Sequence, residues 1–465
     1  MQFSETLKIE TSQHPLGAFG ETDRQLPQTL AQLTLIPLVC VSILAPFIPI
    51  SPALPSFRVE ILLLPVIFFF YGWLLLAGYV REIRVNGMFL VGAVYGLCLL
   101  ISTMYGAALL GQSLVPQDFY EFPKLILPVA FFTVAYEANL SELGLRRLLL
   151  ALGGSLLLIC IYAWGQWGDM GFSRALNEVY TAGKHVDDAL VYARRVYSTM
   201  GNPNVLGELL VWAIAAFLLA FLARIVNQTF LIFILVSALI TLSMTGSRYG
   251  ILNASLAIAL VMFMPNANPQ TNRHRRRKEI VLLFMLLPIF AGAITLVAMS
   301  NPRILERYQT LSNPLVTDST TERFDKLWLD ALNDFYKSPI LGRGPAKDIY
   351  ADINTDSEYL GVLKQFGLLG LLAYLAYYIY PLVLVCRGLR AGKMAGRSLE
   401  AFMPFNYLVM RLGFVMIITA LVMNIGMSTF YNQLLQGFLW IWMGLSARAS
   451  RNIVLAKSFR PYLSA

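Results

Sequence analysis

The chain has 465 residues, of which 57% are hydrophobic and only 14% are charged, and its mean hydropathy is +0.62. Soluble domains carry about 25% charged residues, so this composition excludes an ordinary soluble enzyme and indicates a protein with many membrane-spanning segments. Membrane topology explains the net charge of +9 better than nucleic-acid binding does, so no nucleic-acid partner is expected.

The first 32 residues are polar, and a series of apolar segments follows them. Residues 1–32 lack the short apolar stretch and cleavage site of a removable signal peptide, so we expect a cytoplasmic N-terminal tail. About 20 apolar residues span a bilayer core as a helix. Runs of roughly that length predict an all-α polytopic membrane protein, with about twelve transmembrane helices in a bundle formed by residues 33–447. The predicted spans are Leu33–Ile50, Val59–Val80, Gly87–Leu110, Phe122–Ala138, Leu148–Trp164, Asn204–Ala223, Thr229–Met244, Tyr249–Met264, Ile280–Met299, Tyr359–Cys386, Phe405–Met427 and Leu434–Leu445.

Basic residues in the short connections set the predicted orientation. Loops rich in Lys and Arg stay in the cytoplasm, whereas long loops cross the membrane largely regardless of charge. The run Arg273–Lys278 is the strongest basic signal, and placing it inside makes both termini cytoplasmic, including a basic tail at residues 448–465. The two longest loops, residues 165–203 and 300–357, then lie on the outer face.

The second long loop is predicted to contain an amphipathic helix. Apolar residues repeat at helical spacing between Ser319 and Lys337, and Ser319–Glu322 has the spacing of a capping box. The apolar stripe has two alternative partners, the membrane surface and the transmembrane bundle. Pro339 and the glycines on either side of Arg343 end this helix, which predicts a tight turn that holds Arg343.

The sequence contains no pattern typical of a metal site or a nucleotide-binding site. All four cysteines fall in predicted helices and the three histidines lie far apart, so neither a disulfide framework nor a metal site is expected. There is no Walker A or dinucleotide-binding motif, and the cytoplasmic loops are too short for an ATP-binding domain. We therefore expect no cofactor, and an activated substrate or a gradient must supply the energy.

Basic side chains gather on the predicted outer face. A guanidinium group fits two phosphate oxygens at once, which suits a diphosphate ligand, and pairing with nearby acids is the alternative. Arg248 stands apart because it lies in a minimal turn between two apolar segments, and charged groups near membrane depth usually face a polar cavity. The basic candidates for the site are Arg194, Arg195, Arg248, Arg323, Arg343 and Lys364.

Acidic residues on the same predicted face are candidates for the general base of a reaction. Asp356 and Glu358 stand where the long loop enters an apolar helix, and a carboxylate there could accept the proton of an attacking hydroxyl. The alternative is structural, because Thr355–Glu358 has the spacing of a capping box. Asn204 and Glu208 lie one turn apart at another predicted helix start, and we add both to the candidate binding residues because an acid inside a membrane helix needs a partner.

Three short motifs, taken in order, resemble those of the bacterial O-antigen polymerase and O-antigen ligase superfamily. The loop between the second and third motifs, which contains Arg323, Trp328 and Arg343, is similar to the large periplasmic loop of that superfamily. The likeness covers residues 200–370 and extends loosely to the helix layout of the whole chain. The motifs are Met200–Asn204 at a helix start, Thr245–Arg248 at an outer turn, and Asp356–Ser357 followed after nine residues by Gly367–Gly370.

The resemblance implies a membrane glycosyltransferase of GT-C-like fold that uses undecaprenyl-diphosphate-linked glycans without metal or nucleotide. It implies action at the periplasmic face of the bacterial inner membrane, with membrane lipid, a flippase and chain-length regulators as partners. The family's arginines, matched by Arg248, Arg323 and Arg343, would hold the diphosphate. O-antigen ligases carry their histidine base where this chain has Asp356, so the likeness favours a polymerase that joins repeat units into O-antigen, capsule or exopolysaccharide.

Alternatives to a polymerase stay open at this point. One is a ligase that transfers the glycan to a lipid or protein acceptor. Another is a secondary transporter of an anionic solute, which would use the same arginines for binding and Glu208 or Lys364 for coupling. Transporters often show inverted repeats and broken helices near the membrane midplane, and no convincing repeat is visible in this sequence. A third is a structural member of a polysaccharide-assembly complex.

Overall fold

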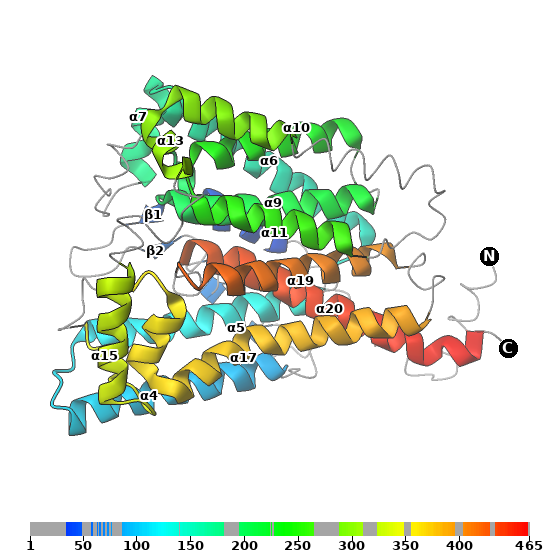
Figure 1. Ribbon diagram of the computed structural model, residues 1–465. Helices are drawn as coiled ribbons and strands as arrows, with labels where there is room; N and C mark the ends of the chain where they lie inside the picture. Colours follow the sequence, from blue (N-terminus) through cyan, green and yellow to red (C-terminus); the bar gives the residue numbers. More distant parts are fainter. Residues whose placement is uncertain are drawn as a thin grey trace.

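The computed structural model confirms an all-α membrane protein (Figure 1). It describes residues 34–48, 57–58, 86–138, 140–180, 195–223, 225, 227–264, 288–309, 323–347, 355–395, 403–427 and 433–463, with single positions between 63 and 76. The predicted span Val59–Val80 and the predicted capping box Ser319–Glu322 fall largely or wholly outside these residues.

The first part of the chain contributes helices to different sides of the bundle. A short helix, Thr34–Leu44, is followed by a small antiparallel pair of strands in which Phe47 faces Arg58. The predicted span Leu33–Ile50 is therefore wrong at its end, because the chain leaves the helix after Leu44 and pairs as a strand. The elements in this part are β1 (Phe47–Ile48), β2 (Phe57–Arg58), α4 (Gly87–Leu109), η1 (Pro116–Tyr120), α5 (Glu121–Ala138), α6 (Glu142–Trp167) and α7 (Gly171–Tyr180).

The middle of the chain contains α9, the most buried of the candidate membrane-spanning helices in the described part of the chain. Asn202 caps α9 through its side chain, and nearly every residue of that helix is buried against α10, α11 and α19. A helix over Pro288–Ser300 follows. The labelled elements here are η2 (Ser198–Met200), α9 (Pro203–Leu222), α10 (Gln228–Met244), α11 (Arg248–Phe263) and α13 (Pro302–Gln309).

The last part of the chain contains the longest helices. The predicted helix between Ser319 and Lys337 consists of a π-helical turn followed by an α-helix. The last predicted span, Leu434–Leu445, is too short, because its helix runs on to Leu463 and includes most of the predicted basic tail. The elements are η3 (Arg323–Trp328), α15 (Leu329–Lys337), α17 (Glu358–Ala395), α19 (Pro404–Met423) and α20 (Gln433–Leu463).

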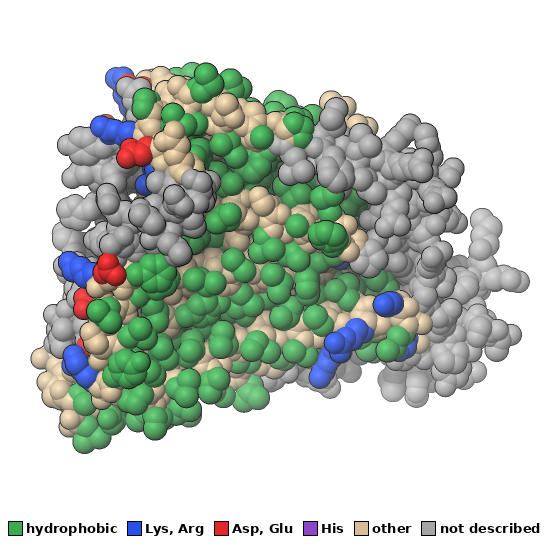
Figure 2. All heavy atoms as spheres, viewed as in Figure 1, with side chains coloured by type: hydrophobic (Ala, Val, Ile, Leu, Met, Phe, Trp, Pro, Cys, Tyr) green, Lys and Arg blue, Asp and Glu red, His purple; other side chains and the backbone are tan. Residues whose placement is uncertain are grey.

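The long helices run side by side, and α15 crosses them at one end (Figure 1). The helix α20 packs against α5, α17 and α19, and α17 also packs against α4 and α15. Five helices in the part of the chain described are long and apolar enough to cross a membrane: α4, α6, α9, α17 and α19. Apolar side chains cover the middle of the visible face, and charged side chains lie towards the two ends (Figure 2). This distribution is the one expected of a bundle that spans a bilayer.

Candidate active site

Arg323 and Asp356 form an ion pair at the end of the bundle where α17 begins. The Nε and Nη2 atoms of Arg323 each lie 3.0 Å from Oδ2 of Asp356. Asp356 has a φ of 52°, a left-handed conformation that is uncommon for a residue other than glycine. The Asp356 side chain is 36% exposed and that of Arg323 is 15% exposed, so a ligand can approach the pair from solvent.

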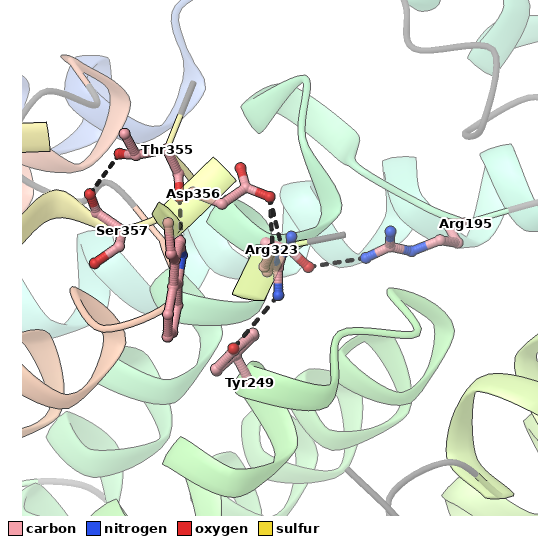
Figure 3. A network of polar contacts seen from close by, with 8 residues as sticks. Arg195, Tyr249, Arg323, Thr355, Asp356 and Ser357 are labelled. Atoms are coloured by element: carbon pink, nitrogen blue, oxygen red, sulfur yellow. Dashed lines mark hydrogen bonds and ion pairs between the residues drawn. The ribbon is translucent and has the colours of Figure 1, made fainter. Parts of the chain in front are cut away.

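Two aromatic side chains hold this ion pair in position (Figure 3). The Arg323 guanidinium lies 5.6 Å from the ring centroid of Tyr249, and its Nη1 atom donates to the Tyr249 hydroxyl at 3.4 Å. The indole N–H of Trp328 donates to the Thr355 carbonyl at 3.1 Å. Because Arg323 and Trp328 both belong to η3, this turn connects the long loop to α11 on one side and to the start of α17 on the other.

The turn between α10 and α11 lies beside the pair and is surrounded by further arginines. Gly246 has a φ of 59°, which lets the chain reverse between the two apolar helices. The Nε atom of Arg195 donates to the Thr245 carbonyl at 2.7 Å, and its Nη2 atom donates to Oδ1 of Asn204 at 2.9 Å. The Nε atom of Arg307, on α13, donates to the Gly246 carbonyl at 3.3 Å. The guanidinium groups of Arg195 and Arg307 therefore both donate hydrogen bonds to backbone carbonyls of the turn that precedes Arg248.

Arg248 is the first residue of α11, directly after the capping residue Ser247. Burial lowers the pKa of the Arg307 guanidinium, and repulsion from Arg248 and Arg323 lowers it further. We call Arg195, Arg248, Arg307 and Arg323 the arginine cluster. Positive charges this close repel one another in a partly buried place, so an anionic ligand would stabilise the arrangement.

Two buried carboxyl groups lie beneath the Arg323–Asp356 pair. Glu208, on α9, is 0% exposed, and neither carboxyl oxygen has a hydrogen-bond partner among the described residues. Glu358, the first residue of α17, is also buried and lies close enough for its charge to act on Glu208. The predicted capping box does not form, because Thr355 Oγ1 donates to the Ser357 carbonyl at 2.7 Å and the Glu358 N–H donates to the Asn424 carbonyl at 3.0 Å.

Arg343 and Lys364 belong to a second group of charges, on the side of α15 that faces α17. The Nη1 atom of Arg343 lies 3.1 Å from Oδ1 of Asp334, which also accepts from Lys337 Nζ at 2.9 Å. Lys364 is buried on α17, within electrostatic reach of Asp334 and Arg343. Arg343 and Lys364 thus have acidic neighbours. Pairing with acids was the alternative to diphosphate binding for the basic residues of the outer face.

The turn that holds Arg343 is joined to a break in α17. Gly367 has a φ of 63° and a ψ of −164° inside this helix, and Gly342 has a φ of 71°. A Cβ atom at Gly342 would lie 2.3 Å from the Gln365 carbonyl oxygen, and one at Gly367 would lie 2.4 Å from the Ile340 carbonyl oxygen. The two backbones therefore touch, and glycine is required on both sides of the contact.

The region that contains most of this site is similar to a known protein family. Residues 233–375 match the family model described as O-antigen ligase. This match supports the O-antigen ligase and polymerase superfamily. A comparison with curated proteins finds no significant match. Superfamily members are membrane glycosyltransferase-like enzymes of surface glycan assembly, and the family implies lipid-linked glycans as substrates.

The matched region contains most of α10, all of α11, α13, η3 and α15, and the first part of α17. It therefore includes most of the arginine cluster together with Asp356. Arg195 and Asn204 come from outside the match and reach the same turn through the contacts described above. Arg194 lies outside the residues that the structure describes.

Tyr249 was not selected from the sequence as a site residue, and Arg307 was counted among the outer-face basic residues but was not selected for the site. Tyr249 directly follows Arg248, and an aromatic residue beside a charged turn is a signal that could have identified it. Arg307 is one of several basic residues in the long loop, and only the packing of α13 against the turn at Gly246 distinguishes it. In the described part of the chain, no three His, Cys, Asp or Glu side chains meet as metal ligands would.

Proposed function

We propose that this protein is an oligosaccharide repeat-unit polymerase. It would join undecaprenyl-diphosphate-linked repeat units into a surface polysaccharide at the periplasmic face of the bacterial inner membrane, with both termini in the cytoplasm. The observation that carries the proposal is the arginine cluster beside the Arg323–Asp356 pair. A diphosphate carries the charge that such a cluster favours, and each guanidinium can bind two phosphate oxygens.

The proposed reaction is a displacement at an anomeric carbon. The hydroxyl oxygen of one lipid-linked repeat unit attacks the anomeric carbon of a glycan carried by a second lipid. A glycosidic bond forms, the bond from the anomeric carbon to the diphosphate oxygen breaks, and its electron pair leaves with undecaprenyl diphosphate. The hydroxyl proton passes to a carboxylate. The arginine cluster stabilises the charge that develops on the leaving oxygen, a contribution that is usually the largest in such a site.

Exposure separates the three candidate carboxylates. Asp356 is part-exposed beside the arginine cluster, so a sugar hydroxyl can come within hydrogen-bond distance of it. Glu358 and Glu208 are buried, so a sugar cannot touch them directly in this conformation. We therefore assign proton acceptance to Asp356. Glu358 and Glu208 do not contact the sugar in this proposal. The ion pair with Arg323 fixes the direction in which the Asp356 carboxylate points.

A ligase is the second candidate, because the matching family model is described as O-antigen ligase. A ligase would use the same diphosphate site and transfer the glycan to a lipid or protein acceptor. The polymerase is preferred because the three histidines of the chain, His14, His185 and His274, are remote in sequence from Asp356, where ligases of this superfamily carry histidine. A flippase and chain-length regulators are the partners that a polymerase would need.

Elongation of a lipid-linked repeat unit by the purified protein tests this function. The protein is placed in nanodiscs with undecaprenyl-diphosphate-linked repeat units, without nucleotide and with a chelator, and glycan length is measured. We expect longer glycans from the unmodified protein. Asp356→Asn should reduce the elongation rate by about 10²-fold or more, because general base catalysis contributes about 10²–10⁴-fold. Asp330→Asn, an exposed acid on α15, is the matched control and should elongate normally.

Two outcomes would reject parts of the proposal. Transfer of the glycan to an added acceptor without elongation would identify a ligase in place of a polymerase. Full elongation by Asp356→Asn, at normal expression, would remove Asp356 from the reaction and leave the fold and family unaffected.

A further inference from the structure

The buried side of α15 includes a carboxylate. Ala331 and Asp334 are its buried residues, and Asp334 accepts the ion pairs from Arg343 and Lys337. A helix on the surface of a soluble domain buries its apolar face and exposes its charges. Leu332 and Phe335 are half-buried, whereas the apolar side chains of Leu329 and Tyr336 are exposed on another side of the helix.

The outward side of α15 is divided into an apolar stripe and a polar stripe. The apolar stripe consists of Leu329 and Tyr336, seven residues apart on α15, and of Ile340 in the turn just beyond the helix, and these side chains are 50%, 71% and 63% exposed. Residues three, four and seven apart lie on one face of a helix. The polar stripe consists of Asp330 and Lys337, seven residues apart and both exposed, and Asn333 lies between the two stripes. The helix therefore has three sides, which face the bundle, an apolar environment and a polar environment.

The apolar stripe continues onto the surface of α17. Just beyond α15, the Pro339 carbonyl accepts from the Leu368 N–H at 2.9 Å, and the Ile340 carbonyl accepts from the Leu369 N–H at 3.2 Å. Leu368, Leu369 and Leu372 are exposed on α17, a helix long and apolar enough to cross a membrane. Figure 2 shows apolar side chains extending along this face towards the end where α15 lies, with charged side chains at the outer edge.

We propose that α15 lies in the membrane interface and buries the stripe Leu329–Tyr336–Ile340 among the acyl chains of the lipid leaflet. The continuity with the exposed leucines of α17 places the stripe at the edge of the same hydrocarbon layer. The polar stripe then faces the headgroups and water, as in other helices that lie along a membrane surface. This surface is separate from the arginine cluster and does not depend on the proposed reaction.

The position of α15 bears on the candidate active site. The turn η3 precedes α15 without interruption, and it supplies Arg323 and the Trp328 indole that donates to the Thr355 carbonyl. A helix fixed in the interface holds these groups at the depth of lipid headgroups. The diphosphate of a lipid-linked glycan lies at that depth, so the lipid leaflet itself helps to align the site with its substrate.

Spin labels on the two outward stripes test the proposal. In a background with Cys40, Cys98, Cys160 and Cys386 replaced by alanine, labels are placed at Leu329→Cys and Tyr336→Cys, and at the matched control positions Asp330→Cys and Lys337→Cys. The full chain is studied in nanodiscs, where collisions with oxygen report on hydrocarbon and collisions with a water-soluble nickel chelate report on water.

The proposal predicts that oxygen collisions dominate at both apolar positions and chelate collisions dominate at both controls. Two positions on each stripe keep the test valid if one labelled variant fails to fold. Equal access of the chelate to all four labels would overturn the proposal, because α15 would then stand in water. Protection of all four labels from both reagents would also overturn it, because another part of the protein would then cover the helix.

Discussion

At the scale of single residues, the carboxyl groups of Asp356 and Glu208 have different surroundings. Asp356 pairs with Arg323 in a place that solvent reaches, whereas Glu208 is enclosed by the bundle. A carboxyl group is costly to bury without hydrogen bonds, and neither oxygen of Glu208 has a hydrogen-bond partner among the described residues. A residue kept in such a place at a cost in stability is expected to serve function.

Replacement of Glu208 by an apolar residue of similar shape tests that expectation. Glu208→Met should raise the stability of the folded protein by about 1–3 kcal/mol, because it removes a buried polar group that lacks hydrogen bonds within the described structure. The same variant should elongate glycans more slowly than the unmodified protein. Thermal unfolding in detergent and the elongation assay measure the two effects.

Leu209→Met is the matched control for that variant. Leu209 is the next residue on α9 and is equally enclosed, and a leucine-to-methionine exchange usually costs less than about 1.5 kcal/mol. A loss of stability in Glu208→Met that exceeds the loss in the control would show that the carboxyl group stabilises the fold. Unchanged elongation in Glu208→Met would remove this residue from the functional site.

Single residues of the site could be predicted only where their place in the chain is unusual. Arg248 and Asp356 stand at abrupt boundaries between polar and apolar sequence, and this is visible without a structure. Arg307 and Tyr249 join the site through contacts with Gly246 and Arg323, which depend on how distant segments pack. Arg343 could not be assigned from sequence either, because its pairing with Asp334 follows from the turn between them.

At the scale of elements, the junction between the long loop and α17 decides where the site residues lie. The loop returns to α17 at Gly367, where the helix that begins at Glu358 is broken. Besides the Gly342–Gly367 contact, the Gly344 N–H donates to the Gln365 carbonyl at 2.7 Å. The junction holds α15 across the first turns of α17, so it also sets the position of η3 relative to Asp356.

An alanine at Gly342 should open this junction. The new Cβ atom would meet backbone atoms of Gln365 and Gly367, and the positive φ adds strain. We expect a loss of about 2–4 kcal/mol in the free energy of unfolding, measured by denaturation, because strain of about 1–3 kcal/mol adds to the displaced contact.

Gly111→Ala is the control for the strain alone. Gly111 has a φ of 66°, but a Cβ atom there would meet nothing within 4 Å among the atoms described. It should therefore cost about 1 kcal/mol. Equal losses in the two variants would mean that the close approach at Gly342 does not stabilise the junction.

The helices themselves were predictable because long apolar runs have few alternatives in a membrane. The predicted spans at Gly87, Asn204 and Phe405 begin within a residue of the helices observed. The break at Gly367 was missed because glycine is common inside membrane-spanning helices, and only the loop that docks there explains it. The pairing of Phe47 with Arg58 was missed because two-residue strands leave no periodic pattern.

At the scale of the whole molecule, charge and apolar surface are separated along the bundle. Charged groups gather towards the two ends, and one of these ends contains both the arginine cluster and α15. Composition and helix count were sufficient to predict this class of architecture. They could not predict which loop residues face one another, because the site combines contributions from α9, α11, α13, η3 and the start of α17.

The central claim is that the arginine cluster binds the diphosphate of a lipid-linked glycan. The most direct measurement is the affinity of the purified protein, in nanodiscs, for undecaprenyl diphosphate without sugars. Arg248→Ala and Arg307→Ala should each weaken binding by about 10–100-fold, because a hydrogen bond to a charged group contributes about 1.5–3 kcal/mol and about 1.4 kcal/mol is tenfold. Arg303→Ala, an exposed arginine on the same helix as Arg307, should bind normally. Unchanged affinity in both cluster variants would contradict the account.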